Sequence, residues 1–124
     1  MLYDKNNIFA KIIRGELPCA KIFEDEKVLA FNDINPAASK HILVVPKGEY
    51  ISFDDFIHKA DDFEVVHFFK IVRKITHDYN MIDAGYRIIS NHGKDASQTV
   101  DHFHIHILAG ERLGGLLAGD NHAR

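Results

Sequence analysis

The segment HFHIHIL, residues 102–108, carries a histidine at every second position over its first five residues. Alternate residues of a β-strand point to the same side of a sheet, so His102, His104 and His106 would present three imidazoles on one face. The apolar residues between them would face the core. A strand face that only contacts solvent usually carries lysine, glutamate or threonine. The segment therefore predicts a half-buried strand whose polar face has a chemical function.

A metal site is one candidate for that function, because histidine is a common zinc ligand. Residues two apart on a strand are separated by about 6.7 Å and the outer two of three by about 13 Å, so three imidazoles of one straight strand do not converge easily on one ion. A His-X-His pair could bind a metal if His41 or His92 supplied a third ligand. The neighbouring acid, Asp101, should point to the opposite face. Ligand geometry makes this the weaker interpretation.

Nucleophilic catalysis at phosphorus fits the spacing better. A neutral imidazole is a covalent nucleophile, and a charged imidazole beside it would lower its pKa and keep it neutral near pH 7. The same charge would stabilise a phosphoryl group in its transition state. His104 has such a neighbour on either side. The spacing therefore favours attack by His104 on a phosphorus atom.

The composition sets broad limits on the protein. With 124 residues, 46% hydrophobic and 27% charged, the chain fits a single domain over residues 1–124. A net charge of −3 argues against a broad nucleic-acid-binding surface. Cys19 is the only cysteine, and neither a signal-peptide stretch nor an apolar segment long enough for a bilayer is found. We expect a cytoplasmic protein, with no nucleic acid and no membrane as partner.

Hydrophobic periodicity predicts two helices and five strands. A short helix at 6–16 would be capped by Asn6 or Asn7 and stop at Gly15, and a long helix should span 61–79. The connections between most strands are short, which favours a largely antiparallel five-stranded sheet in an α+β fold. The strands are predicted at 21–26, 28–34, 41–46, 86–91 and 100–110.

The triad and the Gln-Thr-Val before it resemble the histidine triad (HIT) superfamily. From about Ile8 to Gly110 the chain is similar to the Hint branch, the histidine triad nucleotide-binding proteins, including IFAKIIRGELPCAKIFEDEKVLAFNDINP and HILVVPK. The resemblance implies a HIT-like core over about 6–110, a C-terminal tail at 111–124, and a homodimer. It also implies a hydrolase that binds a purine nucleoside monophosphate or its phosphoramidate, such as AMP-lysine. The reaction would pass through a nucleotidyl-histidine intermediate without a metal or other cofactor.

The resemblance assigns roles to matching residues. His104 would be the nucleophile, His102 and His106 its flanking partners, and His41 the fourth histidine that approaches the triad. Thr99 would also take part in catalysis. The phosphate side would hold Gln98 and Asn91, and the nucleoside pocket would be formed by Asp33 at the ribose hydroxyls, Ile34 beside it, and the apolar walls Ile8, Phe9, Ile22 and Phe31. Without the resemblance, these apolar residues indicate only an ordinary core.

Some residues depart from the Hint pattern. Asp101 stands where an apolar or aromatic residue is expected, Ser97 replaces a common glycine, and Thr99 replaces a frequent serine. The tail lacks the aromatic ending of some Hint proteins, so leaving-group preference is open. Two other functions stay possible: a dinucleotide polyphosphate hydrolase, and a nucleotide-binding or protein-interaction module with weak hydrolysis. The glycine after the triad segment, in HILAGER, favours Hint over the first of these.

Overall fold

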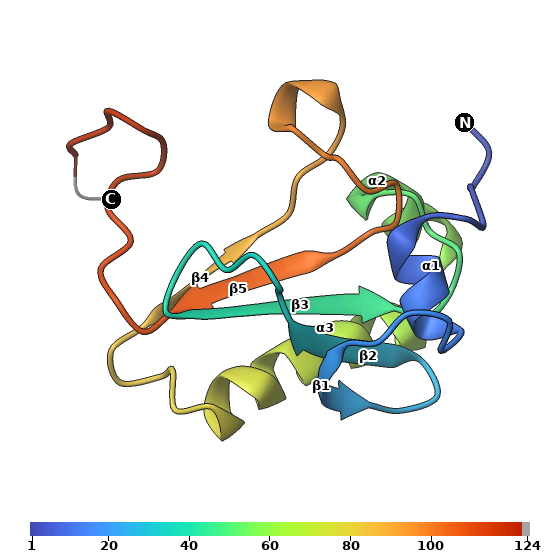
Figure 1. The fold of residues 1–124 in the computed structure, drawn as a ribbon, viewed down its shortest axis with the longest axis horizontal. Coiled ribbons are helices and arrows are strands. Elements are labelled where there is room, and N and C mark those ends of the chain that lie inside the picture. The colour runs from blue at the N-terminus through green and yellow to red at the C-terminus, as the bar shows by residue number, and fades with distance from the viewer. Residues whose placement is uncertain (123–124) are drawn as a thin grey trace.

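The structure, a computed structural model, describes residues 1–122. Its centre is a five-stranded sheet in the order β1-β2-β3-β5-β4, with every neighbouring pair antiparallel (Figure 1). The α+β class and the antiparallel five-stranded sheet expected from the sequence are confirmed. The strands are β1 Ala20–Glu24, β2 Val28–Asn32, β3 Lys40–Pro46, β4 Tyr86–Ile89 and β5 Ile105–Ala109.

The two predicted helices form where capping residues begin them. α1 spans Ile8–Ile13, and the side chain of Asn7 accepts a hydrogen bond from the backbone N–H of Ala10. α3 spans Asp62–Asp78, and Asp61 caps it by accepting from the backbone N–H of Glu64. Among the described residues, no helix combines the length and the apolar character that crossing a membrane requires.

A further helix, α2 at Phe53–Lys59, corrects the prediction of two helices. The reason is a reciprocal cap at its first turn. The Ser52 side chain accepts from the backbone N–H of Asp55, and the Asp55 carboxylate accepts from the backbone N–H of Ile51 at 2.8 Å. This resembles a capping box, except that the carboxylate accepts from the residue before the N-cap, and the Ser-x-x-Asp spacing was a sequence signal for the helix. A 3₁₀ turn at Lys94–Ala96 was also not predicted.

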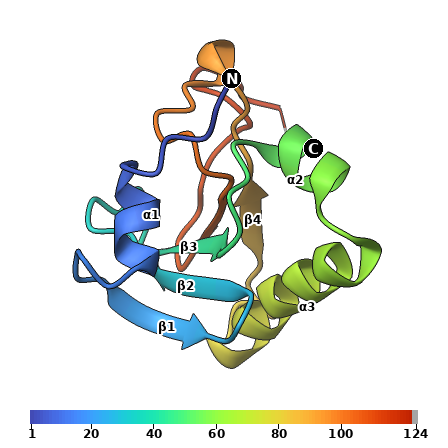
Figure 2. The same cartoon turned by 90° about the vertical axis from the view of Figure 1, so that its right-hand side faces the viewer.

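The sheet is covered differently on its two faces (Figure 2). α2 and α3 cover one face, where Phe56, Phe68 and Ile107 belong to the larger core and are each fully buried. α1 covers part of the other face and packs Phe9 against a smaller core. Because Ile105 and Ile107 face α3, the intervening His106 faces the side of α1. The alternation expected for the triad segment is therefore observed.

The last strand is shorter than the predicted range 100–110. β5 begins only at Ile105, so His102 and His104 precede the hydrogen-bonded ladder. The physical reason lies in β3, which ends at Pro46, a residue without the backbone N–H that would continue the pairing. The segment is instead held by the backbone N–H of Phe103, which donates to the carbonyl of Tyr50 at 2.7 Å.

After β5, residues 111–122 run past the ends of β4 and β5 without further helix or strand (Figure 1). The Arg87 guanidinium in β4 holds this tail by donating to the carbonyls of Gly114 at 2.9 Å and Gly115 at 3.2 Å. A hollow of about 1140 Å³ opens between the tail and the strand ends. None of the three triad histidines lines it, so it is separate from the candidate site.

Candidate active site

The first histidine of the triad is fully buried and positions the second. The Nε2 atom of His102 donates to the carbonyl of Pro46 at 2.7 Å. The carbonyl of His102 in turn accepts from Nδ1 of His104 at 2.7 Å. A carbonyl can only accept, so Nδ1 of His104 carries the proton. In the neutral ring, Nε2 of His104 then keeps its lone pair, which is the state that a nucleophile requires.

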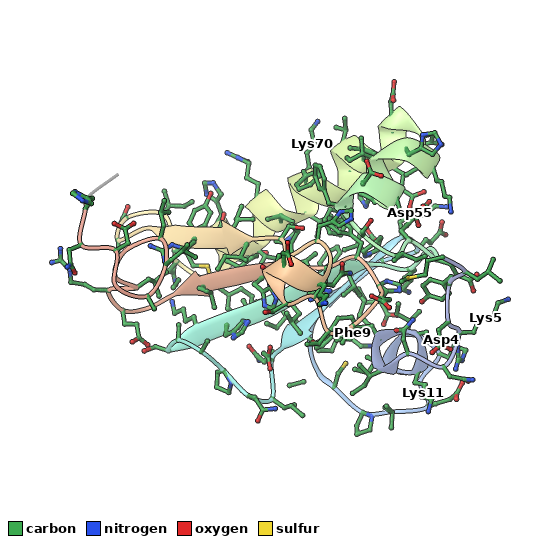
Figure 3. The ribbon with its side chains drawn as sticks, turned by 90° about the horizontal axis from the view of Figure 1, so that it is seen from above. Asp4, Lys5, Phe9, Lys11, Asp55 and Lys70 are labelled. Carbon is green, nitrogen blue, oxygen red and sulfur yellow. The ribbon has the colours of Figure 1, made fainter. Side chains whose placement is uncertain are left out.

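The His104 ring is enclosed by rings on two sides. Phe9 of α1 meets it edge-on, with ring centroids 4.8 Å apart, and His106 lies with its ring centroid 5.0 Å away. Figure 3 shows Phe9 on the side of α1 that faces the sheet, whereas Asp4 and Lys5 lie farther out. This packing restricts the rotation of the imidazole while leaving it half-buried rather than sealed.

His41, the fourth histidine, reaches the triad from β3. The backbone N–H of Ala37 donates to its Nδ1 at 3.0 Å, so the proton of the neutral ring lies on Nε2. Nε2 of His41 is 2.8 Å from Nδ1 of His106 and donates to it. His106 must then carry its own proton on Nε2. One backbone amide therefore sets the tautomers of two histidines and leaves His106 as a hydrogen donor.

Burial keeps these imidazoles neutral. It is the largest cause that lowers the pKa of His102 and of His106, each to about 4, and it also lowers the pKa of His104 and of His41. The expectation that a charged neighbour keeps His104 neutral is therefore corrected, because desolvation contributes most and the neighbours are themselves neutral near pH 7. A bound phosphate would favour their protonated forms.

The metal alternative meets an obstacle in the same hydrogen bonds. Asp33, His41 and His106 have possible ligand atoms within 4.8 Å of one another. A metal on Nε2 of His41 would need the proton on Nδ1, where it would face the N–H of Ala37. That arrangement brings two donors together and loses the hydrogen bond. The donor set thus fits a cation poorly. His92, the other ligand weighed from the sequence, is exposed and outside this group.

Asp33 lies at the end of β2, beside the histidines. One carboxylate oxygen accepts from the backbone N–H of Asn35 at 2.8 Å, and the other is 3.4 Å from Nε2 of His41. Ile34, next to it, is 82% exposed. The carboxylate is half-buried and the isoleucine is open to solvent, so both can contact a ligand that covers this part of the sheet.

The apolar residues predicted for the nucleoside pocket lie on different faces of the sheet. Phe9 and Phe31 pack edge-on with centroids 5.8 Å apart on the α1 face, and Ile8 is 46% exposed. Ile22 instead packs against the larger core on the α3 face, so its predicted role as a wall of the nucleoside pocket is wrong. The β-bulge between Lys21 and Phe23 shifts the register of β1, which sequence alternation does not reveal. Ile12 of α1 packs against the smaller core instead.

The loop between β4 and β5 holds the predicted phosphate-side residues. Gln98 shapes this loop, since its amide accepts from the N–H of Gly93 at 2.9 Å and donates to the carbonyls of Ile51 at 2.8 Å and Val100 at 3.1 Å. Thr99 is exposed on the same loop.

The backbone of this loop also bears on two other residues singled out from the sequence, Asn91 and Ser97. Asn91 is half-buried two residues after Ile89, the last residue of β4, and Ile89 pairs with His106. Ser97 has φ 59°, in the left-handed region. Glycine adopts that conformation without strain, which agrees with the glycine that the family resemblance leads us to expect at this position.

Three partners of the histidines were not predicted from the sequence. They are the hydroxyl of Tyr3, which lies 2.6 Å from Nδ1 of His102, the backbone N–H of Ala37, and the carbonyl of Pro46. Two of them act through the backbone, which carries no side-chain signal. Tyr3 is 99 positions from its partner, too far for any local pattern to connect them.

Comparisons with known proteins agree with this geometry. The family described as HIT domain matches residues 14–113. A 13.2 kDa HIT-like protein from Azospirillum brasilense is 50% identical over 115 residues, covering 93% of this chain and 94% of the relative.

Solved structures extend the likeness to the fold. A HIT family hydrolase from Legionella pneumophila superposes with a TM-score of 0.82 at 32% identity, over 87% of this chain and 96% of that one. A histidine triad nucleotide-binding protein from Candida albicans gives a TM-score of 0.73 at 33% identity, over 82% of this chain and 73% of that one.

Proposed function

Because the chain belongs to the HIT family, we propose that it is a Hint-type hydrolase that cleaves the P–N bond of purine nucleoside 5′-phosphoramidates. The solved relatives named as a HIT family hydrolase and a nucleotide-binding protein support hydrolysis and a nucleotide ligand. The observation that carries the proposal is the tautomer of His104. Its Nδ1 is tied to the carbonyl of His102, so the free Nε2 lone pair is available for attack.

In the first step, Nε2 of His104 attacks the α-phosphorus of the substrate. An N–P bond to His104 forms, the bond from phosphorus to the amine breaks, and the amine leaves with the bonding electron pair. An amine leaves well only when it gains a proton. A bound phosphate favours the protonated form of His106, and this imidazolium can supply the proton from Nε2 and become neutral. The hydroxyl of Thr99, on the loop before the triad, is a second possible donor.

In the second step, water attacks the nucleotidyl-histidine. The N–P bond breaks, the electron pair returns to Nε2 of His104, and the nucleoside monophosphate leaves. The neutral His106 accepts a proton from the attacking water and returns to its protonated form. Both steps use the histidines and water, with Thr99 as a second proton donor, in keeping with a donor set that fits a metal poorly.

The nucleoside end fits the same face of the sheet. The carboxylate of Asp33 can accept hydrogen bonds from two ribose hydroxyls. Phe9 and Phe31 offer apolar surface near the triad for a purine ring, and Ile34 is exposed beside Asp33. Phe9 contacts the His104 ring, so a base held against α1 would place its phosphate near the nucleophile.

The activity is tested by measuring AMP release from adenosine 5′-phosphoramidate and AMP-lysine, with and without a chelator. We expect turnover with both substrates, unchanged by the chelator. Turnover that the chelator abolishes and zinc restores would contradict the mechanism and favour a metal site. Faster hydrolysis of a diadenosine polyphosphate than of the phosphoramidates would instead favour a dinucleotide hydrolase.

We further propose that the active form is a homodimer joined at β4. This strand lies at one edge of the sheet, so its outer backbone groups have no neighbouring strand among residues 1–122. Tyr86 and Ile88 project from it, 40% and 44% exposed, and Tyr79 and Ile82 before it are also exposed. A second copy related by a two-fold axis would pair with this edge and cover the apolar side chains.

Light scattering after gel filtration should give the wild-type protein twice the mass of one chain. Replacing Ile88 with lysine should give the mass of one chain, because the charge would be buried against an apolar copy. Ile57→Lys in α2, at 42% exposure, is the matched control and should stay dimeric. A wild-type protein that is monomeric at high micromolar concentration would show that the dimer proposal is wrong.

A further inference from the structure

Tyr3, in the segment before α1, contacts the first histidine of the triad. Its hydroxyl oxygen lies 2.6 Å from Nδ1 of His102, and the two rings meet edge-on with centroids 5.6 Å apart. Tyr3 is half-buried, whereas His102 is fully buried. The contact therefore links the N-terminal segment to the interior of the candidate site.

The direction of this hydrogen bond follows from the other ring nitrogen. Nε2 of His102 donates to the carbonyl of Pro46, so in the neutral ring Nδ1 has only a lone pair. The hydroxyl of Tyr3 is then the donor. Burial raises the pKa of Tyr3 above its ordinary value, which keeps the phenol protonated. Both nitrogens of a buried imidazole are thus satisfied in a single tautomer.

His102 affects the nucleophile through its backbone carbonyl, whose position depends on how the His102 ring is held. The carbonyl of His102 is the acceptor that fixes Nδ1 of His104. This carbonyl lies before β5, which begins at Ile105, so no ladder holds it in place. The hydrogen bonds of the His102 ring to Tyr3 and Pro46 restrain this residue at both ring nitrogens.

We propose that Tyr3 is a positioning residue for the nucleophile: its hydroxyl fixes the His102 ring, and thereby the carbonyl that orients His104. The inference rests on the proposed function. It differs from a purely structural role, in which Tyr3 would anchor the N-terminal segment and leave the chemistry unchanged. Tyr3 lies before residues 14–113, where the family match is found.

The first test is the Tyr3→Phe variant, which keeps the ring and removes the hydroxyl. With adenosine 5′-phosphoramidate, kcat should fall by about tenfold or more, because small displacements of a nucleophile cost large factors in rate. KM should change little, since Tyr3 contacts the histidine rather than the nucleotide. Tyr50→Phe, which removes a hydroxyl bonded to Glu64 of α3 rather than to a histidine, is the matched control and should keep the wild-type kcat.

The second test measures His102 directly by ¹⁵N NMR of the imidazole nitrogens during a pH titration. In the wild type, Nδ1 should report an accepted hydrogen bond and Nε2 a bound proton. In Tyr3→Phe the neutral ring loses a stabilising donor, so His102 should protonate at a higher pH. The other titratable groups acting on this pair are His104 beside His102, and Asp4, Arg14 and Glu49 around Tyr3, and all are unchanged in the variant.

The outcomes separate the inference from the function on which it rests. A reduced kcat together with an upward shift of the His102 titration supports the positioning role. If the wild-type protein is active and Tyr3→Phe has the same kcat, the inference alone is overturned, even if the variant has a lower melting temperature. An inactive wild-type protein overturns the proposed function and the positioning role with it, whatever the titration reports.

Discussion

Replacing His104 with glutamine should lower phosphoramidate turnover by about 10⁴-fold or more. Removing a nucleophile that forms a covalent intermediate abolishes the reaction path itself, and only transition-state binding by the other groups remains. Affinity for AMP should change far less, because Asp33 and the apolar face by Phe9 are untouched. Turnover and AMP affinity measured on the same preparation would test both expectations.

The covalent step can also be observed directly. Rapid alkaline quenching of wild-type protein with substrate, followed by proteolysis at alkaline pH, should yield a peptide containing His104 that is heavier by one nucleotidyl group. The glutamine variant should give no labelled peptide. His77→Gln, an exposed residue of α3, is the control and should react like the wild type. A label on another residue, or variant turnover above one tenth of the wild-type rate, would be incompatible with His104 as the nucleophile.

The second large effect is a loss of stability in acid. Burial lowers the pKa of His102 to about 4, whereas its ordinary value is 6.5. Between these two pH values the unfolded chain binds a proton that the folded protein does not. The free energy of unfolding must therefore fall as the pH decreases, by about 1.4 kcal/mol per pH unit for one such group. His106, whose pKa is also lowered to about 4, acts in the same direction.

Urea unfolding at pH 7 and at about pH 4.5 measures this effect. In His102→Gln the decrease between the two pH values should be smaller by about 2–3 kcal/mol, because neither the folded nor the unfolded chain then titrates at this position. Glutamine can still donate to the carbonyl of Pro46. His58→Gln, exposed in α2, is the matched control. An equal decrease in the wild type and in His102→Gln would contradict the assignment of this effect to His102.

The sequence predicted most of the sheet because local patterns encode it. The β-branched run of β3 and the helical spacing of α3 lie close to their predicted ranges. The missed helix α2 is short, and its cap at Ser52 and Asp55 was a readable signal that hydrophobic periodicity alone overlooks.

The failures arose where one element depends on another. β5 starts late because its partner β3 ends in Pro46, and Ile22 faces the α3 side because β1 contains a bulge. Neither fact is visible within the segment concerned. Register is a property of two strands together, so it can be predicted from one strand only when that strand is regular.

By itself, the sequence determined that alternate imidazoles share a face, because the two-residue repeat of an extended chain is local geometry. It also determined the antiparallel sheet and the family resemblance. Only the tertiary structure decided which nitrogen of each ring carries its proton. That choice depends on the carbonyl of Pro46, the amide of Ala37 and the hydroxyl of Tyr3, which approach the histidines only after the chain has folded. Folding also buries the rings, and burial rather than residue type keeps them neutral.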